Sequence, residues 1–410
     1  MKRTRNSYEK IFMVKKNSKK ILMTVGICFL TGSFCACGDD TELVLSEVVA
    51  HAQSETALQE NNQGADAMQS SETPQQSTLT AEVTSTPTPQ PDTISITISA
   101  AGDVTLGNYP EQPYEWSLPQ MYDQQQNDAY FFENVYDIFS EDDFTLVNLE
   151  GVLTTAETRR EGVTYNIKGK PEYVNILTEG SIEAVSMANN HRRDYLEQGS
   201  DDTVALLQEA GIAYAYDNNV AICEIGDIRI GYVSVNEIAW KEGVEKLIEQ
   251  GIAKLQEEQA DLIFVCCHWG IEREYYPEEY QQILGRKCID WGADLVIGHH
   301  PHVLQGIEEY QGKFIVYSLG NFCFGANRNP ADKDTMIFQQ TFTFVEGEKQ
   351  EDQNIRVIPC SISSVTNRND YKPTPATGEE ASRIIDKIND CSKDFGVQFD
   401  EDGLLVKEKN

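Results

Sequence analysis

From Ile94 onward, short apolar runs alternate with helical patterns, and this alternation constrains the fold more than any other feature of the chain. Residues 94–99 alternate with a period of two, as a half-buried strand does. Further apolar runs predict strands at 144–147, 184–187, 228–235, 262–267 and 295–297. Spaced apolar residues predict helices at 202–210, 242–255 and 278–291, the first with Gly211 as its C-cap. This order favours an α/β sandwich with a largely parallel central sheet.

Two hairpins and a change in composition complete the predicted domain. The hairpins span 221–235, turning at Gly226-Asp227, and 307–319, turning at Gln311-Gly312. After about Ser364 the sequence becomes polar, and the helical pattern at 379–389 is predicted to be peripheral. We therefore expect one domain at 94–365 and a peripheral C-terminal segment at 366–410.

The N-terminus has the pattern of an export signal. A basic stretch precedes an apolar run, 21–34, that is too short to cross a bilayer comfortably. The run is followed by Cys35-Ala36-Cys37, which resembles a bacterial lipoprotein signal with Cys37 as the lipidated residue. We expect residues 1–37 to be a lipoprotein signal peptide; the alternative is an uncleaved membrane anchor. Either interpretation places the rest of the chain outside the cytoplasm, at the outer face of the cytoplasmic membrane.

Residues 38–93 are predicted to be a disordered tether rich in Ser, Thr, Gln and Pro. From Gly38 to Thr93 there is no aromatic residue and no Lys or Arg. Such a segment cannot bury enough apolar surface to offset the entropy lost on ordering. The tether would hold the domain away from the membrane.

The chain is strongly acidic, with 33 Lys and Arg residues against 66 Asp and Glu, a formal charge of −33. The first twenty residues contain eight basic residues and Glu9, so loss of the signal segment changes the charge by −7, from −33 to −40. A surface of this charge repels nucleic acid, which excludes a nucleic-acid partner. A polyanionic substrate would need a local cationic centre, such as a bound metal.

Polar residues concentrate where the predicted strands end. Five of the six histidines follow a strand directly, whereas His51 lies in the tether. The carboxyl ends of parallel strands share one edge of a sheet, which is where ligands bind. Imidazole, carboxylate and amide ligands suit zinc, manganese or iron. The polar groups that follow the strands are Asp103, Glu150, Asn189-Asn190-His191, His268 and His299-His300-Pro301-His302.

Each of these residues also has a structural interpretation. Asp103 could cap a turn, Glu150 could be a solvated acid, and His268 could be a satisfied core histidine. Asn190-His191 could cap a helix. The three-histidine cluster favours metal binding or catalysis. Thiolate ligation by Cys266 or Cys267 is rejected, because strand alternation directs the two sulfurs to opposite faces of an apolar run.

These segments, in this order, resemble the CapA family of poly-γ-glutamate capsule synthesis proteins, whose fold is similar to calcineurin-like metallophosphoesterases. The resemblance covers about residues 94–324. It implies a sandwich with helices flanking central β-sheets. The segments that carry it are Gly102–Gly107, Asn148–Thr154, Ala188–His191 with Asp194-Tyr195, His268–Gly270, Gly292–Val303 and Tyr317–Phe322.

The resemblance also implies roles for single residues. His191 would be the general acid, and His299 would be structural or support the ligands. Lys168 and Lys170 would contact an anionic substrate, although exposed loop lysines are usually solvated. The phosphoesterase Asp-x-His signature reads Asp103-Val104-Thr105 here, which removes one ligand, so one or two ions are expected. The implied metal ligands are Asp103, Glu150, Asn190, His268, His300 and His302.

Three functions remain open from the sequence. The first is a metal-dependent, phosphoesterase-like hydrolase acting on a cell-envelope phosphoester or an amide-linked polymer. The second is a polymer-handling component of poly-γ-glutamate synthesis or export that uses the metal to bind carboxylates. The third is a non-catalytic surface-binding domain. The ordered set of metal ligands argues against the third, and a charge of −40 favours catalysis at a local site over broad polyanion binding. The expected partners are the membrane, through the lipid anchor, and an envelope polymer with its synthesis machinery.

Overall fold

A computed structural model describes residues 11–13, 91–351 and 353–406 of the chain. The predicted signal segment other than Ile11–Met13, the lipidation site Cys37 and the predicted tether up to residue 90 lie outside the described residues. Across the described ranges, no helix combines the length and the apolar character needed to cross a membrane. All described residues belong to one compact unit.

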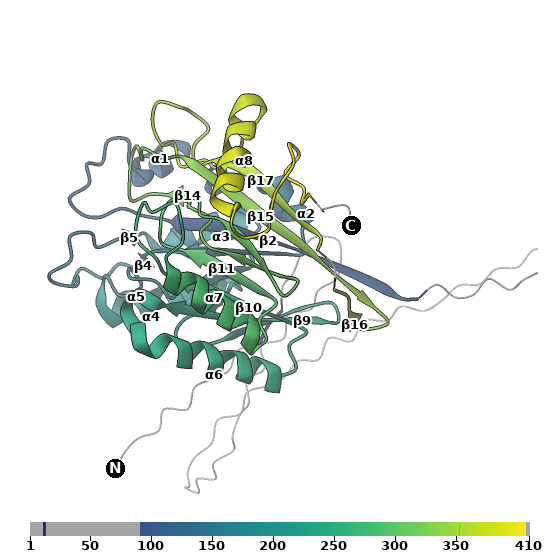
Figure 1. Ribbon diagram of the computed structural model, residues 1–410. Coiled ribbons are helices and arrows are strands. Elements are labelled where there is room, and N and C mark those ends of the chain that lie inside the picture. Colours follow the sequence, from purple (N-terminus) through teal and green to yellow (C-terminus); the bar gives the residue numbers. More distant parts are fainter. Residues whose placement is uncertain (1–10, 14–90, 352, 407–410) are drawn as a thin grey trace, which may run out of the picture. The chain divides into compact units, whose positions relative to one another are not determined.

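The first of two central sheets has the order β1-β8-β9-β10-β11-β13-β12. Figure 1 labels β9, β10 and β11 of this sheet. Strands β9, β10, β11 and β13 run parallel to one another. Strand β8 pairs antiparallel with β9, and β12 pairs antiparallel with β13. The short β1 lies at one edge, parallel to β8. The strands are β1 (Ile11–Met13), β8 (Ala221–Ile225), β9 (Ile228–Asn236), β10 (Leu262–His268), β11 (Leu295–His299), β12 (Ile307–Tyr310) and β13 (Lys313–Val316).

The second sheet has the order β18-β17-β15-β2-β3-β6-β7, with β14 beside β2 and β16 beside β15. Strands β2, β3, β6 and β7 are parallel, and β15 joins them antiparallel to β2. A separate small pair is formed by β4 (Val152–Leu153) and β5 (Lys168–Gly169). The strands are β2 (Thr93–Thr105), β3 (Phe144–Leu149), β6 (Ala184–Ser186), β7 (Ala213–Ala215), β14 (Asn321–Phe324), β15 (Asp334–Val345), β16 (Glu348–Lys349), β17 (Ile355–Ser361) and β18 (Thr374–Pro375).

The two sheets pack face to face through apolar side chains. Phe264 of β10 stacks on Phe342 of β15 with ring centroids 5.8 Å apart. Two buried serine hydroxyls, of Ser186 on β6 and Ser234 on β9, also meet across the interface at 2.7 Å. Burial of these faces removes apolar surface from water and stabilises the sandwich.

Helices cover the outer faces, so the layers run helix, sheet, sheet, helix. Alternate residues of β10 face opposite ways: Phe264 packs in the core between the sheets, while Val265 packs with α6 and α7. On the outer face of the second sheet, Phe132 and Phe139 pack against Phe322 of β14. The helices are α1 (Leu118–Gln125), α2 (Tyr136–Glu141), α3 (Val174–Glu179), α4 (Leu196–Ala210), α5 (Glu237–Trp240), α6 (Val244–Glu257), α7 (Glu279–Trp291) and α8 (Gly378–Ser392), with 3₁₀ turns at Asp128–Phe131, Pro171–Tyr173 and Lys241–Gly243.

The predicted α/β sandwich with flanking helices is confirmed, with one difference. The strands form two mixed sheets, each with a parallel centre, rather than a single largely parallel sheet. Both predicted hairpins form, as β8–β9 and β12–β13. Helix α4 ends where predicted, with Gly211 in the left-handed conformation (φ 74°).

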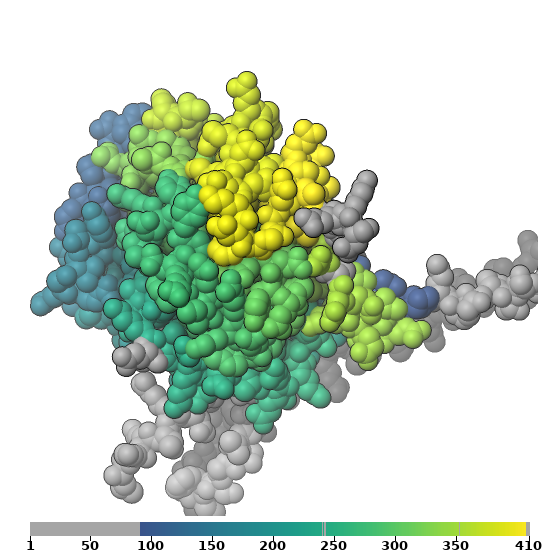
Figure 2. Space-filling model, in the orientation of Figure 1, coloured from purple at the N-terminus to yellow at the C-terminus, as the bar shows by residue number. Residues whose placement is uncertain are grey.

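The C-terminal residues join the same core. Helix α8 buries Ile384, Ile385 and Ile388, and Phe399 beyond it is also buried. Figure 2 shows these yellow residues packed against green residues of the domain. The segment after residue 365 therefore contributes to the structure around the site described below.

Candidate functional site

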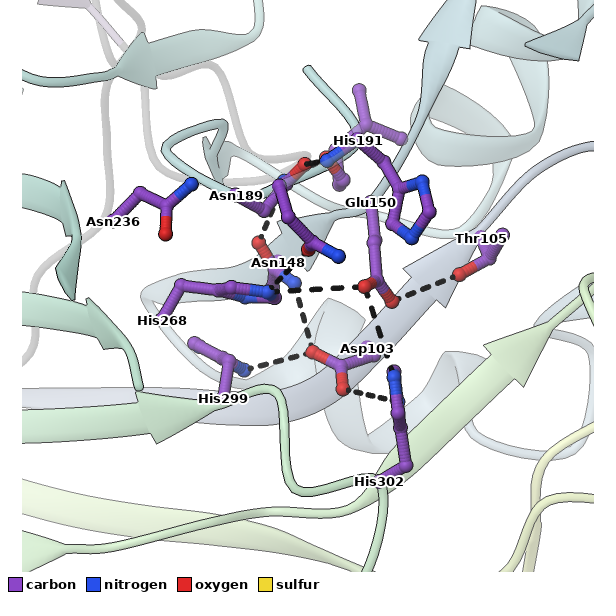
Figure 3. A network of polar contacts seen from close by, with 12 residues as sticks. Asp103, Thr105, Asn148, Glu150, Asn189, His191, Asn236, His268, His299 and His302 are labelled. Atoms are coloured by element: carbon purple, nitrogen blue, oxygen red, sulfur yellow. Dashed lines mark hydrogen bonds and ion pairs between the residues drawn. The ribbon is translucent and has the colours of Figure 1, made fainter. Parts of the chain in front are cut away.

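Polar side chains gather where the carboxyl ends of parallel strands from both sheets meet (Figure 3). Strand register places Asp103 beside Asn148 in one sheet and His268 beside His299 in the other. The sequence pattern assigned these residues to one sheet edge, whereas the structure brings them together from two sheets. The predicted ligands that lie in this cluster are Asp103, Glu150, Asn190, His268, His300 and His302.

A bulge in β2 and a close backbone contact place Asp103. The pairing of β2 with β3 shifts between Ala101 and Asp103. At Gly102 an added Cβ would lie 2.0 Å from the carbonyl oxygen of Gly320, so no larger residue fits there. The Asp103 N–H donates to that carbonyl (2.9 Å), and its Oδ1 accepts a hydrogen bond from Asn148 Nδ2 (2.8 Å). The carboxylate is fully buried and firmly held.

Glu150 lies between two groups of candidate metal ligands. One group is Glu150, His268 and His300, and the other is Asp103, Glu150 and His302. Within each group the ligand atoms lie within 4.8 Å of one another. Glu150 Oε1 is 3.9 Å from His268 Nε2 and 3.9 Å from His302 Nε2. A single carboxylate is thus positioned to serve both groups.

Two of the histidines sit on a loop in an uncommon backbone conformation. His300 has φ 98° and His302 has φ 58°, values that residues other than glycine rarely adopt. Asn321 holds this loop: its Oδ1 is 2.9 Å from His302 Nδ1, and its Nδ2 donates to the His302 carbonyl oxygen (3.1 Å). Backbone strain of this kind persists where surrounding contacts stabilise it, commonly at functional sites.

The chemistry of the cluster fits one or two divalent ions. Among the described residues, buried polar atoms without a hydrogen-bond partner include Glu150 Oε1, His268 Nδ1 and His300 Nδ1. Such atoms are uncommon in folded proteins and point to a ligand outside the polypeptide. Asn190 Oδ1, 2.8 Å from His268 Nε2, adds an amide oxygen. This mixture of imidazole, carboxylate and amide suits zinc, manganese or iron.

His191, the predicted general acid, is oriented by a buried carboxylate. Its Nδ1 is 2.6 Å from Asp194 Oδ2, three residues further along the loop. The other Asp194 oxygen accepts a hydrogen bond from Arg160 (3.1 Å), whose guanidinium also donates to the Asn190 carbonyl oxygen (3.1 Å). This pairing leaves the second ring nitrogen of His191, which lines the cavity of the site, available to a substrate.

Burial and mutual contacts set opposite charges on neighbouring groups. Burial would raise the pKa of Asp103, but hydrogen bonds from two histidines hold that pKa well below its usual value. Burial raises the pKa of Glu150 to about 7. Burial opposes protonation of His302, yet Glu150 and Asp103 raise its pKa to about 9. Burial, reinforced by the charge on His302, lowers the pKa of His300 to about 4. Burial also lowers the pKa of His268 well below its usual value.

Burial also opposes protonation of His191, but its hydrogen bond to Asp194 and the charge of Glu150 raise its pKa. A raised pKa favours the protonated ring, which is the form a general acid requires.

His299 and the two adjacent cysteines lie beside the ligands. His299 is buried, with Nδ1 3.5 Å from Asp103 Oδ1. Cys266 packs between the sheets and Cys267 packs toward the helices, so their sulfurs face opposite ways as expected. Burial raises the pKa of both thiols, which disfavours the thiolate needed for metal binding.

The two lysines predicted to contact substrate are bound elsewhere. Lys168 Nζ donates to the Ala156 carbonyl oxygen (2.8 Å) and lies over the Tyr195 ring (4.6 Å). Lys170 Nζ donates to Asp123 Oδ1 (3.0 Å). Neither lysine lines the cavity that contains the histidine cluster.

That cavity has a volume of about 1190 Å³ and opens beside Glu150, His191 and His302. It runs on past Glu272 and Arg273, in the loop after β10, to residues 326–334 and to helix α8. Its size exceeds the ~300–1,000 Å³ of most small-molecule sites and leaves room for an extended substrate.

Several residues that position the site were not assigned roles from the sequence. Asn189 Nδ2 donates to Asn148 Oδ1 (3.2 Å), and Asn189 Oδ1 accepts from the His191 N–H (3.1 Å). Asn148 could have been inferred, because it precedes Glu150 by two residues on a strand and shares its face. Glu272 forms a further group of candidate ligands with His300 and His302. It lies in the loop after β10, and no sequence periodicity predicts the course of the backbone there.

Comparisons with known proteins show which family the sequence matches. A family model described as bacterial capsule synthesis protein PGA_cap matches residues 97–326, more than half of the chain. The PGA biosynthesis protein CapA of Bacillus subtilis (strain 168) is 29% identical over 249 residues, covering 56% of this chain and 63% of that protein. The capsule biosynthesis protein CapA of Bacillus anthracis is 28% identical over 255 residues, covering 56% and 60%.

A probable polyglutamine synthesis accessory protein of Mycobacterium tuberculosis (strain CDC 1551 / Oshkosh) is 27% identical over 212 residues, covering 44% of this chain and 55% of that protein. The chain spans about three fifths of the length of the two Bacillus relatives. The matched residues include every candidate metal ligand and His191.

Proposed function

We propose, from the premise that the chain belongs to the bacterial capsule synthesis protein (PGA_cap) family, that it is an exported metal-dependent hydrolase acting in capsule or poly-γ-glutamate synthesis. The observation that carries the proposal is the position of Glu150, whose carboxylate belongs to both groups of candidate ligands. Two ligand groups that share a carboxylate are the arrangement expected of a two-metal hydrolytic centre.

Each ligand group would hold one ion. Asp103 and His302 would complete one site with Glu150; His268 and His300, with the amide oxygen of Asn190, would complete the other. A divalent ion bound there would supply Lewis-acid polarisation of the scissile group. The chain itself contributes a buried and rigid set of donors, since Asp103 is held by Asn148 and the histidine loop is held by Asn321.

His191 would act as the general acid for the leaving group. Its Nδ1 is engaged by Asp194, which fixes the orientation of the ring and presents the other nitrogen to the cavity. Arg160 holds Asp194 in place by a second contact. Proton transfer from a positioned histidine contributes roughly 10²- to 10⁴-fold to a hydrolytic rate.

The proposal includes export and a lipid anchor at Cys37, with an envelope polymer as partner. Its support is the sequence of residues 1–37 and the capsule-related names of the relatives. Anchoring at the outer face of the membrane would place the cavity where an envelope polymer is assembled.

Elemental analysis of the purified full-length chain tests the metal centre. We expect a transition metal near one or two equivalents in the wild type, and its loss when His300 and His302 are both replaced by alanine, because each ligand group then retains only two of its three side chains. His51→Ala, outside the described residues, is the control and should keep the metal. Equal metal content in the double variant and the wild type would refute the centre.

Turnover on a panel of phosphoesters and γ-glutamyl peptides tests the hydrolase. The competing function is a polymer-handling component that binds carboxylates through the metal without turnover. Full metal occupancy with no hydrolysis of any substrate class would favour that function over the hydrolase.

A further inference from the structure

The cavity beside the candidate metal centre differs in charge from the rest of the chain. Acidic residues outnumber basic ones two to one overall, 66 against 33. The cavity lining, by contrast, contains equal numbers of the two. In so acidic a chain, a cavity with a balanced lining repels an anion less than the rest of the chain does.

Two of the lining cations are neutralised by the protein itself. Arg383 of α8 makes two hydrogen bonds with Asp334 at 2.6 and 2.7 Å. Lys387, one turn further along α8, contacts both Asp334 and Asp332. These ion pairs join α8 to the start of β15, and their charges are already compensated.

Three other lining cations, Arg273, Arg328 and Lys333, have no ion pair with a carboxylate among residues 91–351 and 353–406; we call them the cavity cations. Arg328 donates only to the backbone carbonyl oxygen of Glu115 (2.8 Å), and Lys333 Nζ only to that of Thr366 (3.3 Å). Their positive charges are therefore available to a ligand in the cavity.

The backbone positions of the cavity cations are held firmly. The Arg273 N–H donates to the Pro301 carbonyl oxygen (2.8 Å), which ties its loop to the loop of the ligating histidines. Arg328 and Lys333 accept backbone hydrogen bonds from Asn369 and Ile362, both at 2.9 Å. A fixed backbone lowers the entropy lost when these side chains bind an anion.

The cavity cations also divide between two parts of the sequence. Arg273 lies within the residues matched by the family model, whereas Arg328 and Lys333 follow its end at residue 326. The candidate metal ligands and two of the three cavity cations thus come from different stretches of the chain.

We propose that the cavity cations bind successive anionic groups of a linear polyanion whose reacting bond lies at the candidate metal centre. The inference rests on the proposed function, because it places the substrate in the same cavity. Arg273, next to the histidine loop, would contact an anion close to the reacting bond. Arg328 and Lys333, which line the same cavity, would contact other anions of the polymer and set the preference for a charged chain.

Binding to the full-length, metal-containing protein tests the proposal by calorimetry, with γ-linked oligoglutamate and inorganic polyphosphate as separate probes. We expect Arg273→Gln, Arg328→Gln and Lys333→Gln each to weaken binding of at least one probe about two- to five-fold, and the triple variant about 10- to 100-fold. The affected probe identifies the anion as carboxylate or phosphate. The affinity of the wild type should also fall with added salt more steeply than that of the triple variant.

Lys246→Gln is the matched control, because it removes one exposed positive charge from α6, away from the cavity. It should bind both probes as the wild type does. γ-Linked oligoglutamate with its free carboxylates converted to amides should bind wild type and triple variant equally.

The proposal is overturned if the folded triple variant, checked by its thermal unfolding, binds both polyanions within two-fold of wild type, or if Lys246→Gln loses as much affinity. Metal content and turnover are measured on the same samples. A charge-dependent loss of binding in a protein without turnover would refute the hydrolase and leave the anion sites supported.

Discussion

The ring of His191 is oriented by a carboxylate from its own loop, and this contact distinguishes it from the candidate ligands. Asp194 is fully buried and also accepts a hydrogen bond from the Ile167 N–H (2.7 Å). The candidate ligands His268 and His302 instead face Glu150 and Asp103. The geometry therefore separates a residue that would move a proton from residues that would hold an ion.

Replacing His191 by alanine should reduce turnover by about 10²- to 10⁴-fold and leave metal content unchanged, because the ring belongs to neither ligand group. An activity assay with the most active substrate of the panel measures turnover, and elemental analysis measures metal content. Arg193→Ala, two residues away and exposed, should retain activity. Turnover that survives in His191→Ala at the wild-type rate would remove His191 from the mechanism.

At this scale the sequence predicted which side chains converge, but not what supports them. Asp103, Glu150 and His268 could be predicted because each follows an apolar strand, and strand ends share an edge. Asn321 could not, because its contact with the histidine loop depends on β14 lying beside β2. Lys168 and Lys170 do not line the cavity, and their ammonium groups contact other partners.

At the scale of elements, strands and hairpins were predictable and their assignment to sheets was not. A period-two pattern predicted β2, an apolar run predicted β9, and glycine-containing turns predicted both hairpins. Nothing in an isolated apolar run says which of two sheets it joins, since that choice depends on contacts between distant segments. For the same reason α8, whose pattern was visible, could not be placed in the cavity wall.

The ion cluster between α8 and β15 makes folding stability depend on pH. Burial would raise the pKa of Asp334, but hydrogen bonds from Arg383 and Lys387 lower it below its usual value. A depressed folded-state pKa means that the stabilisation is present above the unfolded-state value near 3.8. It is lost as the pH falls through the folded-state pKa.

Asp334→Asn should therefore lower the free energy of unfolding by about 1–3 kcal/mol at neutral pH. The difference from wild type should shrink toward zero as the pH falls below 3.8. Denaturant unfolding of both proteins at a series of pH values measures this difference in the free energy of unfolding. Asp386→Asn, exposed on the same helix, should change stability by less than about 0.5 kcal/mol throughout. A deficit for Asp334→Asn that stays constant down to acid pH would contradict the ionic origin.

At the scale of the whole molecule, the N-terminal segment and the rest of the chain carry opposite net charges. The basic residues of the N-terminal segment contrast with the acidic remainder, which would carry −40 after the change of −7 described above. Anionic lipid headgroups would repel such a domain. Stable attachment to a membrane would then depend on a covalent lipid anchor.

Lipidation at Cys37 predicts that Cys37→Ser abolishes membrane attachment or leaves an uncleaved precursor, because serine supplies no thiol to acylate. Intact-mass measurement and detergent phase partitioning of protein from the producing cells detect either outcome. Cys35→Ser, two residues earlier in the same segment, is the matched control, and it should yield the wild-type mass and remain in the detergent phase. If Cys37→Ser matches the wild type in both mass (apart from the substitution itself) and partitioning, then attachment does not use this cysteine, and the uncleaved anchor becomes the better interpretation of residues 21–34.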